Sequence, residues 1–281
     1  MKLLRTCRIN FFHWKTDLKY PVSLLYLILY MWYATHGFVT YARQLQYPIA
    51  PYLFPFLPAS TSFVYLLIPF VLIISDAPFR NQQQLFILLR VGKRTWIASQ
   101  LLYLLICSSC YTLLIWILSW LFLIPQLEWS TQWGPVITTA AVNGGYSSYS
   151  TLSLEYGVMK GIGPISATMW VAFVMIAVCF LLGIIMTLCN LWFQKGLGTV
   201  IISCFAILPL IINVLAHTPR LVKKLLWISP VSWMDRNLMG NVNQNLPSYM
   251  YGLLAPVLIS ILLTCVIYAT IHRCDLERTK E

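Results

Sequence analysis

Residues 161–194 read GIGPISATMWVAFVMIAVCFLLGIIMTLCNLWFQ, thirty-four residues without one acidic or basic side chain. About 20 mostly apolar residues in a helix are enough to cross the hydrocarbon core of a bilayer, which is about 30 Å thick. A helix satisfies its own backbone hydrogen bonds, so a single apolar segment of this length can lie in lipid in that form. The stretch therefore predicts a membrane-spanning helix.

Five further charge-free runs flank it along the chain. They are Tyr20–Ala42, Gln44–Ser75, Thr95–Leu127, Gly196–Pro219 and Asn237–His272. Within the six runs we expect spans near Pro21–Tyr41, Ala59–Ser75, Trp96–Ile124, Ser166–Phe193, Thr199–His217 and Tyr249–His272. The sequence thus predicts an all-α membrane protein with six transmembrane helices over 20–272, preceded by residues 1–19 and followed by a tail over 273–281.

The composition of the whole chain agrees with a membrane protein. Of the 281 residues, 59% are hydrophobic and only 10% are charged, and the mean hydropathy is +0.74. A soluble domain carries about 25% charged residues, and a disordered chain is poor in hydrophobic ones. Both classes are excluded. The net charge of +11 favours anionic lipid headgroups over nucleic acid as a partner.

The basic residues predict the orientation of the chain, because cytoplasmic loops are enriched in Lys and Arg. With the N-terminus in the cytoplasm, thirteen of the nineteen basic residues lie inside and six outside. We therefore expect both termini in the cytoplasm. The cluster Arg220–Arg236 is the exception, since it would lie outside.

The first nineteen residues have the pattern of a basic amphipathic helix. The apolar residues Leu4, Cys7, Phe11, Trp14 and Leu18 recur at intervals of three and four, and Arg5, Arg8, Lys15 and Lys19 occupy a neighbouring face. Such a helix is suited to the plane of the inner headgroups, with its tryptophan at the boundary. It would serve either as an anchor that sets the topology or as an elbow that braces a moving bundle.

A second short helix is expected in the cytoplasm, between the second and third spans. Asp76 is placed to cap it, Pro78 is tolerated in its first turn, and Gly92 is placed to end it. Its apolar stripe would consist of Leu85, Leu88 and Leu89. The next span would be anchored at the headgroups by Lys93, Arg94 and Trp96. A helix tethered at both ends can transmit the motion of a bound partner, although an ordinary basic turn accounts for the pattern equally.

The other connections are simpler. The turn Leu191–Gly198 between the fourth and fifth spans is short, with Lys195 as its only charge. Outside, Pro48–Pro58 has four prolines and predicts a cap or re-entrant turn rather than a regular helix. We expect a solvated loop over 125–165 and one or two short interfacial helices over Arg220–Pro247.

The energy source is expected in another subunit. The sequence has no G-x-x-x-x-G-K-[ST] phosphate loop, and none of its eight acidic residues falls within a predicted span. Ion-coupled transporters usually place ionisable residues at mid-membrane depth. No G-x-S-x-G, H-E-x-x-H or His/Cys metal pattern appears either, so we expect no catalytic residue, no metal and no cofactor bound by this chain.

Together these elements resemble the membrane subunit of type-2 ABC exporters, the permeases that pair with separate ATPase subunits. The local match is the Asp76-x-Pro78 start followed by Leu89-Arg90-x-Gly92-Lys93-Arg94-x-x-Trp96, a pattern common in stand-alone bacterial permeases of this type. The architectural match covers nearly the whole chain.

The resemblance implies that two permeases, identical or related, form a translocation path in a bacterial cell membrane, and that two ATPase subunits holding ATP and Mg²⁺ dock on the inner face. The residues implied to couple to the ATPases are Asp76, Pro78, Phe79, Arg80, Leu89, Arg90, Gly92, Lys93, Arg94, Gln194 and Lys195. The interfacial helix is represented by Leu4, Arg5, Arg8, Phe11, Trp14 and Lys15, and the outer re-entrant segment by Trp227, Pro230, Trp233, Asp235 and Arg236.

The lack of charge in the spans favours an amphipathic or hydrophobic cargo, such as a peptide, an antibiotic or a lipid. Two other classes of protein remain open. A multi-pass membrane enzyme acting on lipid-linked substrates would bring acids, His or Cys together near one face. A non-transporting immunity or sensor protein would hold a peptide at the outer surface and need no ATPase.

Overall fold

The computed structural model describes residues 2–59, 63–79, 82–143, 152, 154–193, 196–215, 218–240 and 245–271. Within these ranges the regular structure is helical, and extended pairing is limited to one isolated bridge between Ile49 and Leu127. The prediction of an all-α protein is therefore confirmed.

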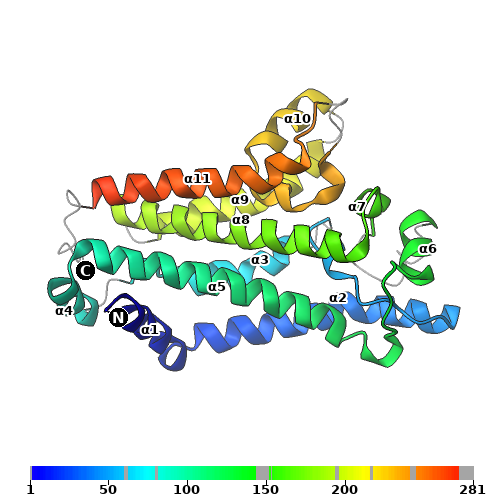
Figure 1. Ribbon diagram of the computed structural model, residues 1–281, viewed down its shortest axis with the longest axis horizontal. Coiled ribbons are helices and arrows are strands. Elements are labelled where there is room, and N and C mark those ends of the chain that lie inside the picture. Colours follow the sequence, from blue (N-terminus) through cyan, green and yellow to red (C-terminus); the bar gives the residue numbers. More distant parts are fainter. Residues whose placement is uncertain are drawn as a thin grey trace.

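Five helices are long and apolar enough to cross a membrane. They are α2 (Lys19–Leu45), α5 (Lys93–Leu121), α8 (Pro164–Trp192), α9 (Leu197–Val214) and α11 (Tyr249–Thr270). Each overlaps one of the predicted spans, and Figure 1 shows α2, α5, α8 and α11 extended along the long axis of the molecule. This arrangement indicates a multi-pass membrane protein.

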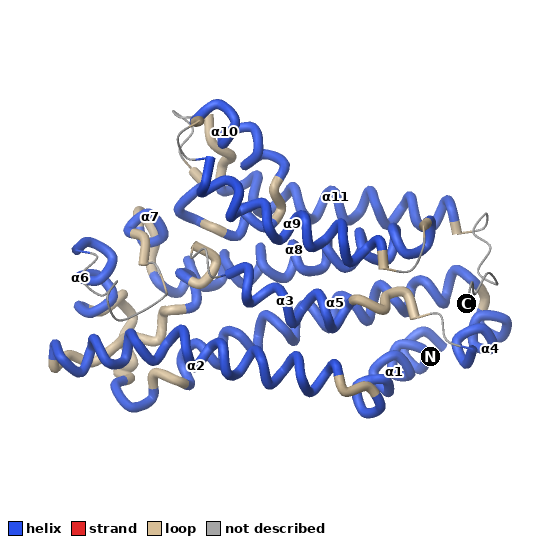
Figure 2. The backbone as a smooth tube through the Cα atoms, turned by 180° about the vertical axis from the view of Figure 1, so that it is seen from behind, coloured by secondary structure: helices blue, strands red, loops and turns tan. Residues whose placement is uncertain are grey.

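The predicted span Ala59–Ser75 corresponds to a shorter helix, α3 (Phe63–Ile74). Its twelve described residues are about 18 Å long, less than the hydrocarbon core of about 30 Å. The 3₁₀ helix η1 (Phe54–Phe56) precedes it in a buried segment. Helix α3 packs against both α2 and α9 and keeps one exposed face, with Tyr65, Ile68 and Leu72 on it (Figure 2).

The centre of the bundle is α8, which packs against α5, α9 and α11. Small residues on α8 allow the close approach of α5. A Cβ atom added at Gly183 would meet the side chain of Leu104 at 3.1 Å. Because dense packing leaves no space for such a group, glycine at this position sets the distance between the two helices.

The shorter elements gather at the two ends of the bundle (Figure 1). We call one the α1/α4 end, after α1 (Lys2–Thr16) and α4 (Gln82–Val91), and the other the α10 end, after α10 (Pro219–Ile228). The α10 end also holds α6 (Pro135–Asn143), α7 (Tyr156–Met159) and the 3₁₀ helices η2 (Ile124–Gln126), η4 (Val231–Met234) and η5 (Arg236–Leu238). The predicted short helices over Arg220–Pro247 are confirmed, as is the irregular course of Pro48–Pro58.

One buried arginine holds the α10 end together. Arg236 donates hydrogen bonds to the carbonyl oxygens of Val158 at 3.0 Å and Lys160 at 3.1 Å. Its guanidinium also lies 4.2 Å from the ring centre of Tyr249. Nearby, the indole of Trp233 donates to the carbonyl oxygen of Leu226 at 2.9 Å. The segment between α9 and α11 is thereby fixed to α7 and to α11.

Candidate functional site

The α1/α4 end contains most of the residues implied to contact an ATPase, and it is built on helix α1. The indole of Trp14 donates to the hydroxyl oxygen of Tyr103 on α5 at 2.9 Å. The Tyr103 ring lies 4.8 Å from Phe11 and 5.2 Å from Phe79, centre to centre. Aromatic contacts of this kind add to the apolar area that is buried. Helix α1 is therefore packed onto the bundle through its aromatic face.

The remaining residues of the predicted α1 pattern lie in different environments. Cys7 is buried, whereas Leu4 and Leu18 are exposed. The side chains of Arg5 and Arg8 are also exposed. The side chain of Lys15 lies outside the described residues.

The link between α3 and α4 is tied to the start of α2 by an ion pair. Lys19 donates a hydrogen bond to the carboxylate of Asp76, and both side chains are partly exposed. The sequence predicts that Asp76 caps α4 and that Pro78 lies in its first turn, and both predictions are wrong. Helix α4 begins at Gln82 in the described chain, and the intervening link instead packs Pro78 and Phe79 into the protein interior.

Asn190, in the last turn of α8, joins two connections that are distant in the sequence. Its side-chain amide donates to the carbonyl oxygen of Ala77 at 2.8 Å. Its side-chain oxygen accepts from the backbone N–H of Gly198 at 3.2 Å and, more weakly, of Gly196 at 3.4 Å. One buried side chain therefore holds the α3–α4 link against the α8–α9 turn.

Helix α4 has one packed face and one open face. Ile87 and Leu88 pack against a buried cluster that includes Trp96 of α5. Phe86 and Leu89 are 75% and 77% exposed, and Arg90 is exposed beside them. These three residues recur at helical spacing, so they form one continuous outer face, which we call the α4 face.

The start of α5 follows α4 directly. Gly92, with φ +86°, separates the two helices, so the prediction that it ends α4 is confirmed. Arg94 is exposed and Lys93 partly exposed. The prediction that Trp96 lies at the headgroups is wrong, because it is buried against Leu191, Ile267 and Ile271 at the contact of α5 with α8 and α11.

The structure thus brings together Asp76, Pro78 and Phe79 in the link, Leu89 and Arg90 on α4, and Gly92, Lys93 and Arg94 at the start of α5. Arg80, Gln194 and Lys195 lie outside the described residues. Sequence reasoning missed Phe86 and Asn190. A signal for Asn190 was present, because a polar amide near the end of an apolar span usually has a specific partner.

The α1/α4 end combines an exposed helix face with buried hydrogen bonds. In the part of the chain that the structure describes, no group of three or more His, Cys, Asp or Glu residues is placed to hold a metal ion. The site consists of an exposed apolar and basic face on a short helix, with hydrogen bonds that lead from its connections into several long helices.

The outer residues implied by the resemblance lie at the α10 end. Pro230, Trp233, Asp235 and Arg236 are buried, and Trp227 is 43% exposed. Burial of a carboxyl group disfavours its charged form. It raises the pKa of Asp235 to about 7, an effect opposed by the backbone N–H groups of Asn237 and Leu238 and reinforced by the negative charge of Glu155.

Comparison with protein-family models, with curated proteins and with solved structures finds no match to this chain. The five long apolar helices define the class of the protein, which is a helical, multi-pass membrane protein.

Proposed function

We propose that this chain is the permease subunit of an ATP-driven type-2 exporter in a bacterial cell membrane. Six spans, α2, α3, α5, α8, α9 and α11, would form its half of the translocation path, with both termini in the cytoplasm. Separate ATPase subunits would bind ATP and Mg²⁺, and this chain would not itself be an enzyme. The observation that supports this proposal best is the Asn190 cross-link, which unites two cytoplasmic connections behind the exposed α4 face.

Because of this cross-link, a force applied to α4 is transmitted to several long helices. A displacement of α4 passes to α5 through the single residue Gly92. It passes to α3 through the link that contains Ala77, and from there through Asn190 to α8 and α9. Buried hydrogen bonds resist breaking because the separated groups would be left without water. A partner that moves α4 would therefore move four spans together.

The α4 face supports the contact with an ATPase. Phe86 and Leu89 are large apolar side chains in open positions, with Arg90 next to them. Protein interfaces are often centred on such apolar anchors surrounded by polar groups. The proposed ATPase surface is therefore an apolar groove with acidic residues at its rim.

The outer side of α9 supports contact with a second permease copy or a related permease chain. Val200, Ile207 and Val214 are exposed along this helix, which is the least buried of the five long ones. Membrane lipids would cover the exposed apolar residues of α2. The cargo proposed is amphipathic or hydrophobic: a peptide, an antibiotic or a lipid.

The test is to purify the protein from its native membrane and identify the chains that remain bound. We expect an ATPase with a phosphate loop to co-purify, and the double variant Arg90→Glu/Arg94→Glu to lose it. The matched control is Arg220→Glu/Lys224→Glu, which reverses two exposed charges at the α10 end. The control is expected to retain the ATPase.

Two results would contradict the proposal. One is a chain that purifies without an ATPase and keeps its cellular activity when ATP is depleted, as an enzyme on lipid-linked substrates or an immunity protein would. The other is equal loss of the ATPase from both double variants, which would show that net charge rather than the α4 face controls the association.

A further inference from the structure

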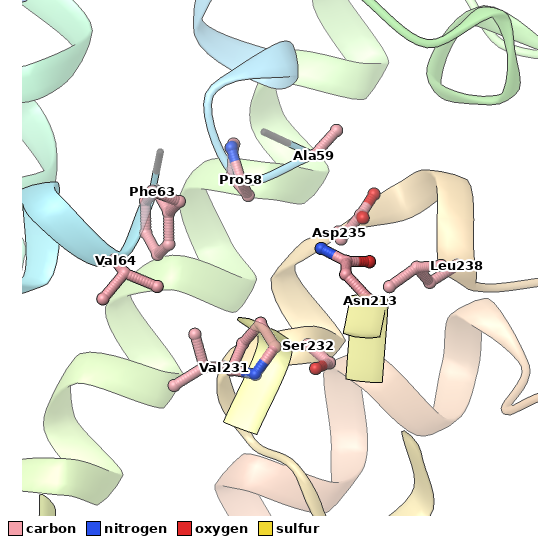
Figure 3. Close-up of a pocket in the computed structure, with 10 residues that line it drawn as sticks. Pro58, Ala59, Phe63, Val64, Asn213, Val231, Ser232, Asp235 and Leu238 are labelled. Carbon is pink, nitrogen blue, oxygen red and sulfur yellow. The ribbon is translucent and has the colours of Figure 1, made fainter. Parts of the chain in front are cut away.

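A small cavity at the α10 end has mixed chemistry. Its volume is about 40 Å³, and it lies between the start of α3, the last turns of α9 and the segment η4–η5. Pro58, Phe63, Val64, Pro209, Val231 and Leu238 form most of its apolar wall. Three polar side chains, Asn213, Ser232 and Asp235, complete it (Figure 3). This volume exceeds the roughly 10–15 Å³ that one water molecule needs, so the cavity can admit a small polar group.

The carboxylate of Asp235 is the charged group of this cavity. Asp235 is only 7% exposed, and among the described residues no basic side chain forms an ion pair with it. The neighbouring guanidinium of Arg236 is engaged with the carbonyl oxygens of Val158 and Lys160. A buried carboxylate without a countercharge is costly, so a cation that enters the cavity gains a strong attraction.

The polar groups are suited to a donor with several N–H bonds. Asp235 accepts a hydrogen bond from the backbone N–H of Asn237 at 2.8 Å, and the backbone N–H of Leu238 also stabilises its charged form, which leaves further lone pairs on the carboxylate. Ser232 shares a hydrogen bond with Ser229 at 2.8 Å, and its oxygen can also accept. Figure 3 shows Asn213 and Asp235 on one side of the cavity, opposite Phe63 and Val64. An ammonium group has three donors for these three side chains.

We propose that this cavity binds the primary ammonium group of an amphipathic cation, with its alkyl part against the apolar wall. A hard metal ion is a poorer occupant, because Ca²⁺ takes six to eight oxygen ligands and Mg²⁺ demands near-ideal octahedral geometry. A quaternary ammonium is a poorer occupant too, because it has no N–H donor for these three side chains. The site does not depend on the permease role, although a cationic cargo would use it.

Protonation of Asp235 competes with the cation. The pKa of Asp235, raised to about 7 chiefly by burial, means that acidification neutralises the carboxylate. Glu155 is the acid that acts on it from the α7 side. The described lining residues from α3 and α9 are Phe63, Val64, Pro209 and Asn213, none of which titrates. Binding is therefore expected to weaken about tenfold for each pH unit below about 7.

The test uses the chain alone in lipid nanodiscs, with n-hexylammonium as the probe. We expect saturable binding above about pH 7.5 that weakens tenfold or more in Asp235→Asn. Asparagine is also a good N-cap, so the backbone hydrogen bond of η5 is kept. Hexan-1-ol is the neutral control and hexyltrimethylammonium the control without N–H donors, and both are expected to bind at least tenfold more weakly. Glu155→Gln is the matched variant, because it removes a nearby exposed carboxylate that does not line the cavity, and above about pH 7.5, where Asp235 is ionised in both proteins, it should keep the affinity.

A second variant, Asn213→Leu, tests the proposal independently if Asp235→Asn fails to fold. Asn213 is exposed at the end of α9, so Asn213→Leu fills the cavity at little cost to the fold, and it should abolish binding. Equal affinity of wild type and Asp235→Asn, or of hexylammonium and hexan-1-ol, would overturn the proposal. Because no ATPase is present, either result would leave the permease proposal standing.

Discussion

The side-chain amide of Asn190 donates to the carbonyl oxygen of Ala77 at 2.8 Å, across 113 positions of sequence. The same side chain accepts from the backbone of the α8–α9 turn. The α3–α4 link and the α8–α9 turn are therefore joined through one side chain, although nothing in the sequence of either connection predicts this contact.

Replacement of Asn190 by leucine should destabilise the protein. Leucine has a similar size but leaves the carbonyl of Ala77 and the N–H of Gly198 without their buried partner. Unsatisfied buried groups cost about 1–3 kcal/mol each, so we expect a loss of about 2–4 kcal/mol in the free energy of unfolding. Thermal unfolding of the purified protein in detergent would measure it.

The control for this variant is Thr187→Val, one turn earlier on α8. The hydroxyl of Thr187 bonds only within its own helix, to the carbonyl oxygen of Gly183 at 2.9 Å. We expect a loss of about 1 kcal/mol or less, because that carbonyl keeps its helical partner. If the two variants unfolded at the same temperature, Asn190 would not be a cross-link.

The ion pair between Lys19 and Asp76 should contribute a small coupling energy. Their side chains are 24% and 33% exposed, so water screens the interaction, and about 0.5–1 kcal/mol is expected. A double-mutant cycle with Lys19→Met and Asp76→Asn would measure it by thermal unfolding. The exchanged pair Lys19→Asp/Asp76→Lys should recover part of the loss. Strictly additive single variants would exclude a direct interaction.

Gly198 should not tolerate even a methyl group. An added Cβ would lie 2.8 Å from the side-chain oxygen of Asn190 and 2.9 Å from the carbonyl oxygen of Met186. We expect Gly198→Ala to lower the free energy of unfolding by about 1–3 kcal/mol. Gly163→Ala is the control, because no atom lies within 4 Å of its Cβ position and its φ of −74° suits alanine. Equal stability of the two variants would show that the α8–α9 turn is free to move.

The long helices could be predicted from the sequence because charge is so scarce in it. The run 161–194 predicts a span at Ser166–Phe193, and the helix extends over Pro164–Trp192. The first and last residues of such helices can be predicted from their neighbours in the sequence, because a charged residue lies near each end and glycine lies where the chain reverses. The start of the second span at Ala59 was misplaced, because Ala59 lies in a turn after the proline-containing helix η1, and the described helix covers Phe63–Ile74.

The contacts of the candidate site could be predicted only in part. The sequence correctly predicts that the helix ends at Gly92. This prediction needs no distant contact, because it depends only on the positive φ that glycine adopts readily. The sequence assigns Asp76 to a cap and Trp96 to the headgroups, and both assignments fail because the true partners are distant in the chain. Lys19 and Leu191 become neighbours of these residues only when the bundle is packed.

The stability of the protein should depend on pH through Asp235. Its folded-state pKa of about 7 lies above its ordinary value of 3.8. Below about pH 4 the carboxyl is protonated in both states. As the pH rises toward 7, the unfolded chain loses the proton first, so stability falls, and it levels off above about pH 7. Between about pH 5 and pH 8 we expect a loss of about 2–3 kcal/mol.

Asp235→Asn isolates this contribution from those of other groups, because its side chain does not titrate. The difference in unfolding temperature between the variant and the wild type, measured in steps from about pH 5 to pH 8, should increase in favour of the variant and then become constant. Glu155 raises the pKa of Asp235, so Glu155→Gln should shift the same curve to lower pH without removing it. A shift to higher pH would mean that Glu155 stabilises the charged form. A difference that does not change with pH would mean that Asp235 is ionised throughout this range.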